Sequence, residues 1–173
     1  MEYLIVVDMQ NDFITGALGT AEAAAIVPAV AERIRTFHGR VLFTRDTHEA
    51  NYLETQEGRK LPVPHCIRNT AGWQLHPMIE ALRTEPPIDK PTFGSMTLAE
   101  RLRGETVERV TLIGLCTDIC VLANAMLLRA ALPETPIVVD AACCAGVTPE
   151  SHRRALEAMK PCQIEILEVA GNA

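Results

Sequence analysis

Cys120 stands in a passage that is typical of a strand, a tight turn and the start of a helix. The apolar run Val110–Leu115 leads into turn residues at 114–117, and Thr117 or Asp118 can cap the helix that follows. Cys120 then lies in the first helical turn, where free backbone N–H groups and the helix dipole lower the pKa of a thiol. The same N–H groups can hold an oxyanion. The passage suits a cysteine nucleophile, although a cysteine packed under a sheet explains it equally well.

Two charged residues supply what such a nucleophile needs. Asp8 closes the apolar run that begins at Tyr3, so its carboxylate emerges at the sheet edge where open α/β proteins bind ligands. Lys90 follows another short apolar segment. Taken singly, Asp8 is also explained as a helix cap or a solvated loop charge, and Lys90 as a surface cation. With Cys120 they supply a nucleophile, a proton acceptor and a cation that brings the other two into a working charge state.

A second group of residues has the types that bind metals. Asp46 and His48 follow the apolar run 40–45, and an i, i+2 pair in extended backbone points both side chains to one side. His65 comes later, beside Pro64. The spacing alone is a weak signal, because a histidine beside proline is more often a loop residue with a satisfied hydrogen bond. The three residues are therefore candidate ligands.

The elements that position these residues are predicted from short Val-, Ile- and Leu-rich runs that alternate with segments of helical period. We expect strands at Tyr3–Asp8, Arg40–Arg45, Pro87–Asp89, Val110–Leu115, Ile137–Val139 and Gln163–Glu168. We expect helices at Ala21–Phe37, Leu75–Arg83, Leu98–Arg103, Asp118–Ala131 and Pro149–Met159. This alternation predicts an α/β fold, a three-layer α/β/α sandwich with a mostly parallel sheet of roughly six strands. The segment Thr47–Trp73 has neither period, and loops of that length are usually functional.

Composition limits the partners. The chain has 173 residues, of which 48% are hydrophobic and 22% charged, as expected for a single globular domain over residues 1–173. Its net charge of −6 argues against nucleic acid and anionic lipid as partners. No apolar run reaches the roughly 20 residues of a membrane span, and the start lacks the features of a secretory signal. We therefore expect a cytoplasmic protein whose six cysteines stay reduced.

Three blocks of sequence carry a family resemblance. Val-Val-Asp-Met-Gln-Asn-Asp-Phe at 6–13, Lys-Pro-Thr-Phe-Gly-Ser at 90–95 and Gly-Leu-Cys-Thr-Asp-Ile-Cys-Val at 114–121 resemble the signature blocks of the isochorismatase-like cysteine hydrolases, which have a Rossmann-like fold. The resemblance implies a catalytic triad of Asp8, Lys90 and Cys120. It also implies an oxyanion hole formed by the backbone N–H groups of Cys116 and Cys120, and a cis peptide between Leu115 and Cys116.

The resemblance also bears on the metal. Nicotinamidases of this family carry Asp-x-His and a later Pro-x-His-Cys that bind a divalent metal, usually zinc, with manganese or iron as alternatives. Asp46, His48 and His65 match those positions. Some relatives add a glutamate between the histidines, for which Glu57 is the nearest candidate and Glu54 the second. The resemblance thus implies a metal-containing amidase.

Nicotinamide is the first substrate that the resemblance implies, because the metal motif separates nicotinamidases from isochorismatases. Phe13, Leu115 and Ile119 are expected to contact the substrate. Pro62 departs from the family pattern, which has a tryptophan there, and the aromatic residue expected after the lysine block is replaced by Met96 and Thr97. A non-aromatic amide or a carbamoyl or ureido compound is therefore an alternative substrate.

Two further alternatives belong to other classes of function. One is a non-catalytic module on this fold, and the other is a thiol redox sensor that uses Cys116 and Cys120. Trp73 and Tyr52 are candidates to reach the pocket from the long loop, and each is equally well explained as an anchor covering apolar surface. Since relatives are commonly oligomers, we expect a homodimer or homotetramer.

Overall fold

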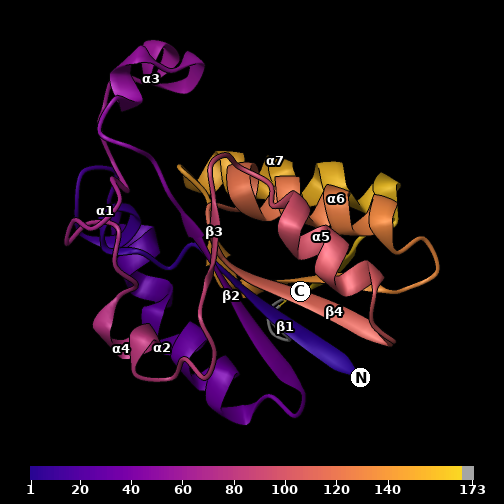
Figure 1. The fold of residues 1–173 in the computed structure, drawn as a ribbon. Helices are drawn as coiled ribbons and strands as arrows, with labels where there is room; N and C mark the ends of the chain where they lie inside the picture. The colour runs from indigo at the N-terminus through magenta and orange to yellow at the C-terminus, as the bar shows by residue number, and fades with distance from the viewer. Residues whose placement is uncertain (169–173) are drawn as a thin grey trace.

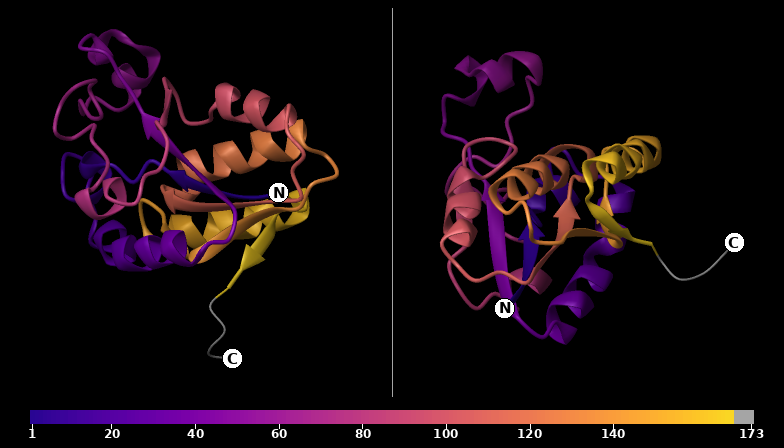
Figure 2. Two further views of the ribbon diagram at one scale, coloured as in Figure 1. Left: turned by 60° about the horizontal axis from the view of Figure 1, so that its bottom comes forward. Right: turned by 90° about the vertical axis from the view of Figure 1, so that its right-hand side faces the viewer.

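A parallel sheet organises the molecule. The computed structural model describes residues 1–168, and its strands lie in the order β3-β2-β1-β4-β5-β6, every neighbouring pair being parallel. The strands are β1 (Glu2–Val7), β2 (Arg40–Asp46), β3 (Ile88–Lys90), β4 (Arg109–Leu115), β5 (Ile137–Ala145) and β6 (Glu165–Leu167). The predicted six-stranded α/β sheet is confirmed, and Figure 2 shows β6, in yellow, at one of its edges.

Helices cover both faces of this sheet. The α-helices are α1 (Asn11–Ile14), α2 (Ala21–Thr36), α3 (Gln56–Lys60), α4 (Pro77–Glu80), α5 (Met96–Arg103), α6 (Leu122–Ala131) and α7 (Pro149–Met159). Helices α5, α6 and α7 lie on one face, and α1, α2 and α4 on the other (Figure 1). In β1, Ile5 packs into the apolar cluster on the side of α5, α6 and α7, and Leu4 packs into the apolar cluster on the side of α1, α2 and α4. Such a strand is buried on both faces, which explains its continuous apolar sequence.

Residues 49–64 form an arm that projects beyond the layers (Figure 1). It contains the short 3-10 helix Tyr52–Glu54 and α3, so the segment predicted to lack regular structure carries two short helices. Tyr52 is buried at the base of the arm, and its hydroxyl donates a hydrogen bond of 2.9 Å to the carbonyl of Leu61. This bond closes the arm on itself.

Several predicted boundaries differ from the structure, and three of them have a local cause. Strand β5 runs on to Ala145 because its small residues pair with the end of β4, where Gly114 lies opposite Cys144. Helix α4 spans only Pro77–Glu80, since Leu75 is held in a bridge to Gln10. Strand β6 begins at Glu165, because the backbone at Gln163 is left-handed (φ 62°).

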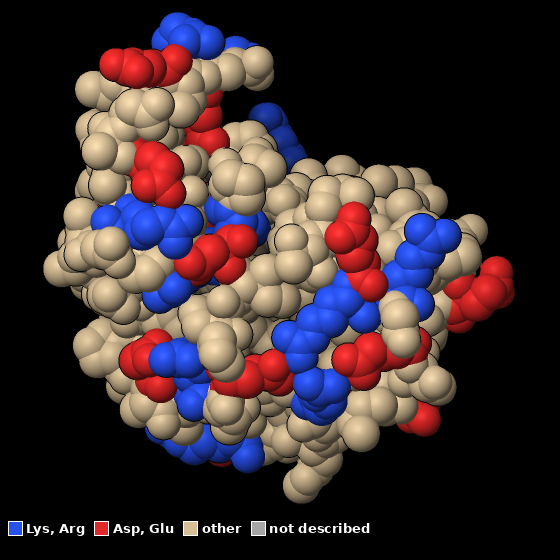
Figure 3. Space-filling model, viewed as in Figure 1, with Lys and Arg blue, Asp and Glu red and all other residues tan. Residues whose placement is uncertain are grey.

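The distribution of charge on the surface and the character of the helices are relevant to the expected partners. On the face seen in Figure 3, Lys and Arg side chains are interspersed with Asp and Glu side chains. Within residues 1–168, no helix combines the length and the apolar character that a membrane crossing requires. The expectation that nucleic acid is not a partner stays a prediction.

Candidate active site and metal centre

The candidate residues gather where the central strands end. Asp8 directly follows β1, Asp46 and Lys90 are the last residues of β2 and β3, and the register places these two opposite each other. Asp8 adopts a left-handed backbone conformation (φ 47°), which is uncommon for a residue with a side chain and recurs at functional sites. The parallel strands thus bring residues that are far apart in sequence to one edge.

Lys90 contacts the two other members of the predicted triad. Its Nζ lies 2.6 Å from Asp8 Oδ2 and 3.5 Å from Cys120 Sγ. The side chains of Asp8 and Lys90 are fully buried, and Cys120 is 4% exposed. Thr44 donates a hydrogen bond of 2.7 Å to Asp8 Oδ1. Asp8 Oδ2 therefore has the Lys90 ammonium as its charged partner, beside the thiol of Cys120.

Burial and charge set the protonation of these groups. Burial would lower the pKa of Lys90, but Asp8, Cys120 and Asp46 outweigh it and raise that pKa, so Lys90 stays cationic. Burial raises the pKa of Asp8 above its usual range, against the opposing effect of Lys90. The carboxylate is therefore a stronger base than a solvated one.

The thiol of Cys120 differs from the prediction. Burial and the Asp8 carboxylate raise its pKa well above the usual value, although Lys90 opposes this. The prediction of a lowered pKa is therefore wrong for the free protein, because burial of the sulfur and the Asp8 carboxylate raise that pKa. The sulfur stays protonated until a base removes its proton.

The turn that carries Cys120 also differs from the predicted helix start. Thr117–Val121 winds as a single π-type turn before α6, and neither predicted cap is used. Thr117 Oγ1 instead lies 2.8 Å from His152 Nδ1, and Asp118 Oδ1 accepts a bond of 3.1 Å from the backbone N–H of Val147. Both side chains therefore tie the turn to the segment around the start of α7.

The backbone N–H groups of Cys116 and Cys120 lie close together in the chain. Cys116 directly follows β4 and precedes the π-type turn Thr117–Val121, which contains Cys120. The peptide bond between Leu115 and Cys116 is cis, as the resemblance implied. These two N–H groups are the donors that the resemblance implies for an oxyanion.

Four side chains beside Lys90 form a metal-type cluster. The ligand atoms of Asp46, His48, Glu57 and His65 all lie within 4.8 Å of one another. Asp46 Oδ2 is 3.0 Å from His48 Nε2 and 3.6 Å from His65 Nε2. Glu57 Oε1 lies 3.6 and 3.7 Å from the same two nitrogens, so Glu57 joins the cluster from the arm.

The donor set fits a divalent ion. Two imidazole nitrogens and two carboxylates are ligands that zinc, manganese and iron accept. His65 Nδ1 lies 2.8 Å from the carbonyl of Val63, a contact that places the ring proton on Nδ1 and leaves Nε2 free to ligate. Despite its burial, the pKa of Asp46 is lowered by the hydrogen bond from His48 and by the charge of Lys90, so Asp46 carries the negative charge that a cation needs.

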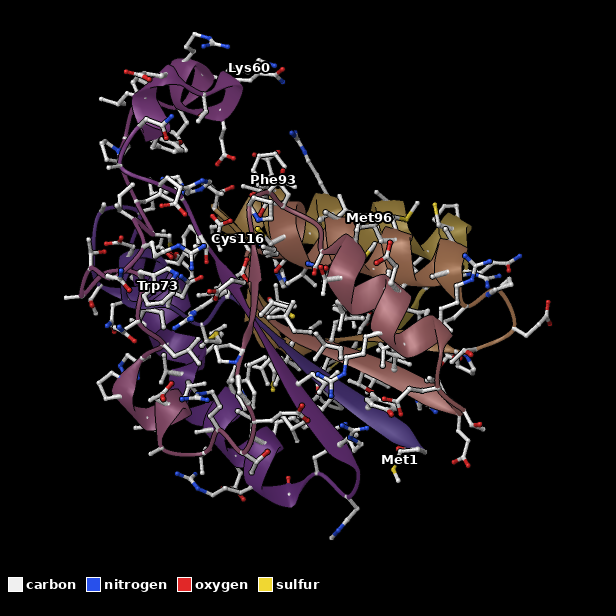
Figure 4. All side chains as sticks on the ribbon, in the orientation of Figure 1. Met1, Lys60, Trp73, Phe93, Met96 and Cys116 are labelled. Atoms are coloured by element: carbon white, nitrogen blue, oxygen red, sulfur yellow. The ribbon has the colours of Figure 1, made fainter. Side chains whose placement is uncertain are left out.

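A small cavity adjoins the nucleophile. Its volume is about 50 Å³, and its lining includes Phe13, Leu61, Phe93, Ile119 and Cys120. It meets a hollow of about 450 Å³, lined in part by Leu61, Phe93, Ile119 and the arm. Figure 4 shows Phe93 between the arm and the body of the molecule, close to Cys116. The site therefore opens outward between the arm and the segment that follows Lys90.

The cavity includes only part of the expected contact set. Leu115 does not line the cavity, because its side chain is fully buried in the apolar cluster on the side of α1, α2 and α4. Trp73 donates a hydrogen bond of 2.8 Å to Thr47 Oγ1, and the guanidinium of Arg45 lies over its ring. Trp73 therefore anchors the loop. Tyr52 packs against the rings of His48 and His65, with centroids 4.7 and 5.0 Å away. Neither ring reaches the cavity lining.

Sequence and structure comparisons now place this geometry among known proteins. The family described as Isochorismatase domain matches residues 2–171. The chain belongs to this family. It is 30% identical over 188 residues to a nicotinamidase/pyrazinamidase of Mycobacterium tuberculosis, covering 96% of this chain and 98% of that protein.

Two solved structures share the fold. A crystal structure of a Pyrococcus horikoshii pyrazinamidase in complex with zinc has a TM-score of 0.80 and 34% identity, covering 96% of this chain and 98% of that one. A pyrazinamidase/nicotinamidase from Streptococcus mutans has a TM-score of 0.84 and 27% identity, with 96% and 100% covered. The likeness therefore extends over nearly the whole of each chain.

Sequence reasoning missed several residues of the site. Phe93 lies in one of the three resembling blocks, yet its aromatic ring was not expected in the pocket. Asp12 Oδ2 accepts a hydrogen bond of 2.7 Å from the N–H of Cys66, next to the candidate ligand His65. Asn124 interrupts a long apolar run, and a buried polar residue in such a run is a signal that could have been noticed.

Proposed function

We propose that this protein is a metal-containing cysteine amidohydrolase that converts nicotinamide to nicotinate and ammonia. The observation that carries the proposal is the position of Lys90 Nζ, 2.6 Å from Asp8 Oδ2 and 3.5 Å from Cys120 Sγ, beside a four-residue metal-type cluster. The nicotinamidase and pyrazinamidase names of the relatives support the same reaction class.

The first half of the reaction forms an acyl-enzyme. Asp8 takes the proton of the Cys120 thiol as the sulfur attacks the amide carbon, and the raised pKa of Asp8 suits this transfer. The N–H groups of Cys116 and Cys120 hold the oxyanion that forms. Asp8 then protonates the departing nitrogen, and ammonia leaves a thioester on Cys120.

The second half returns the free thiol. Asp8 accepts a proton from a water molecule that attacks the thioester carbon, and the same proton returns to the sulfur as the bond to Cys120 breaks. The carboxylic acid is released. Lys90 stays charged throughout, because three acidic groups surround its ammonium.

Asp46, His48, Glu57 and His65 are the residues that would hold the metal, and zinc is our first choice. When bound, a divalent ion would supply positive charge, and with four protein ligands it would need a fifth position to accept a ring nitrogen or water. Lys90 Nζ lies 3.4 Å from Asp46 Oδ1, so one carboxylate belongs to both groups. The side chains that would hold the ion therefore adjoin the nucleophile group directly.

Two aromatic side chains favour an aromatic amide. Phe13 and Phe93 both line the cavity beside Cys120, and Phe93 supplies the second ring that Met96 and Thr97 lack. Leu61 lies next to Pro62, where family members carry a tryptophan, and covers the same wall. Stacking against flat rings favours a pyridine over an aliphatic amide.

The proposal is tested by measuring ammonia release from nicotinamide, a ureide and an aliphatic amide, before and after chelation. We expect nicotinamide to be the best substrate and chelation to abolish its turnover. Turnover of the ureide or the aliphatic amide alone, with metal bound, would assign the alternative substrate class. No ammonia from any amide, together with a reversible disulfide between Cys116 and Cys120, would assign the redox module.

The assignment carries two expectations about the protein in solution and in the cell. We expect a homodimer or a homotetramer, which sedimentation velocity distinguishes from a monomer. We expect a cytoplasmic location, which fractionation of the source cells tests.

A further inference from the structure

Two amide side chains lie completely buried behind the site without belonging to it. Gln10 and Asn124 are each 0% exposed, and each makes three hydrogen bonds to backbone groups, one of which joins Asn124 to Cys120 one helical turn earlier. Burying an amide costs free energy unless its donors and acceptors are paired, so these bonds are the condition for placing the residues there.

Gln10 holds the backbone of a cluster residue. Its Oε1 accepts a hydrogen bond of 2.7 Å from the N–H of Asp46, and its Nε2 donates one of 2.8 Å to the carbonyl of Asp46. Nε2 also donates a bond of 2.9 Å to the carbonyl of Trp73. Strand β1 ends at Val7 and does not extend alongside Asp46. The Gln10 side chain therefore makes the backbone hydrogen bonds that a longer β1 would have made on that side of β2. Only an amide can both accept and donate in this way.

Asn124 holds the backbone of the nucleophile. Its Nδ2 donates hydrogen bonds of 2.8 Å to the carbonyl of Cys120 and 3.2 Å to the carbonyl of Phe93. Its Oδ1 accepts one of 2.9 Å from the N–H of Ser95. These bonds tie the turn of Cys120 to the segment that follows Lys90, whose Nζ itself donates to the carbonyl of Thr92 at 3.0 Å.

We propose that Gln10 and Asn124 are positioning residues with separate duties in the reaction proposed above, on which this inference rests. Gln10 fixes Asp46 and thereby sets the affinity for the metal. Asn124 fixes the carbonyl of Cys120 and the Phe93 segment, and thereby sets the position of the sulfur relative to Lys90. Gln10 bonds to the backbone of a cluster residue and Asn124 to the backbone of the nucleophile. The two groups touch through the contact of Asp46 with Lys90, so the two residues should have effects of different size on metal affinity and kcat.

The experiment compares Gln10→Met with Asn124→Leu, which keep approximate volume and remove the amide. Zn²⁺ affinity is measured by competition with a chromophoric chelator, and kcat for nicotinamide is measured at saturating Zn²⁺. We expect Gln10→Met to weaken Zn²⁺ binding by about 10–100-fold, with a smaller relative loss of kcat. We expect Asn124→Leu to lower kcat by about 10–100-fold and to change the Zn²⁺ affinity by less than about twofold.

Conservative variants separate positioning from a merely structural role. Gln10→Asn and Asn124→Ser keep a neutral polar group in each buried place, so each should show the same pattern as its partner with a smaller loss. They also replace Gln10→Met or Asn124→Leu if circular dichroism shows that either fails to fold. Equal losses of Zn²⁺ affinity and kcat in both residues' variants, or native Zn²⁺ affinity in the Gln10 variants, would overturn the inference.

The native protein keeps the two proposals apart. If it binds no Zn²⁺ or releases no ammonia from nicotinamide, the proposed function fails and takes this inference with it. If the native protein does both and the variants do not divide as described, only the inference fails.

Discussion

The two halves of the site lie side by side but are built differently. The nucleophile half (Asp8, Lys90 and Cys120) is at most 4% exposed, and two of its members stand at strand ends. The metal half (Asp46, His48, Glu57 and His65) takes only Asp46 from a strand. Its Glu57 comes from the arm, with 18% of its side chain exposed.

This difference indicates which half of the site keeps its arrangement without a bound ion. The register of parallel strands fixes Asp46 opposite Lys90, so the ammonium has its place before any ligand arrives. Glu57 lies on the projecting arm, His48 and His65 lie on loops, and the four ligand atoms gathered within 4.8 Å include two carboxylates. We therefore expect the nucleophile half to persist without metal, and the metal half to need the ion for its full order.

Removing the nucleophile should have the largest effect. Cys120→Ala leaves Asp8 and Lys90 paired but removes the atom that attacks, so kcat for nicotinamide should fall by roughly four orders of magnitude or more. Asp8→Asn should lose ammonia release as well. Steady-state kinetics at saturating Zn²⁺ measures both.

Cys162→Ser is the matched control, because this thiol lies in the short 3-10 helix Lys160–Cys162 before β6, away from the carboxyl ends of the strands where the site lies. It should keep native kcat. Comparable turnover by Cys120→Ala and Cys162→Ser would show that the reaction does not pass through Cys120.

Removing the buried cation should cost stability next. Lys90→Met leaves Asp8 fully buried without its partner at 2.6 Å, and breaking a buried pair from one side costs about 3–5 kcal/mol. Urea unfolding with metal bound gives the change in the free energy of unfolding. The double variant Lys90→Met/Asp8→Asn should recover part of the loss, and no recovery would mean that the two charges are not coupled.

Removing the metal should have a smaller effect on stability and a local one on structure. A ligand at 100 times its Kd stabilises the folded state by about 2.7 kcal/mol, so chelation should lower the midpoint of urea unfolding accordingly. Hydrogen exchange should then rise in the arm, residues 49–64, more than in β1 and β4. Glu57→Gln should reproduce much of this at the same Zn²⁺ concentration, whereas Glu54→Gln should not, because Glu54 lies outside the cluster.

The sequence predicted the parts of this site that regular strands position. Apolar runs ended by Asp8, Asp46 and Lys90 require their side chains to meet at one edge, and the register confirms this geometry. The pairing of histidines with a carboxylate came from the family resemblance as much as from the residues, and the order of the strands was not predicted. The strand ends depend on local periodicity, which a sequence displays directly.

What the sequence did not predict depends on tertiary burial. The pKa of Cys120 is raised because the folded protein removes water from the sulfur, and no local pattern reports that. The π-type turn at Thr117–Val121 similarly depends on partners such as His152, 35 residues away in sequence. The roles of Gln10 and Asn124 exist only once distant backbone segments have come together.

The smallest expected effect tests how the nucleophile turn is tied to α7. Burial lowers the pKa of His152 below its usual 6.5, although Asp118 opposes this, so the unfolded chain binds the proton more readily than the folded one. The stability that neutral His152 contributes is therefore complete above pH 6.5 and is lost as the pH falls through the folded-state pKa. Urea unfolding at pH 7.5 and 5.5 should show a smaller decline for His152→Gln than for the native protein, since glutamine does not titrate. His38→Gln, in a loop away from the turn, should decline like the native protein. An equal decline in all three proteins would mean that protonation of His152 is not linked to folding, and the turn would then owe its place to Asp118 and to the packing of α6.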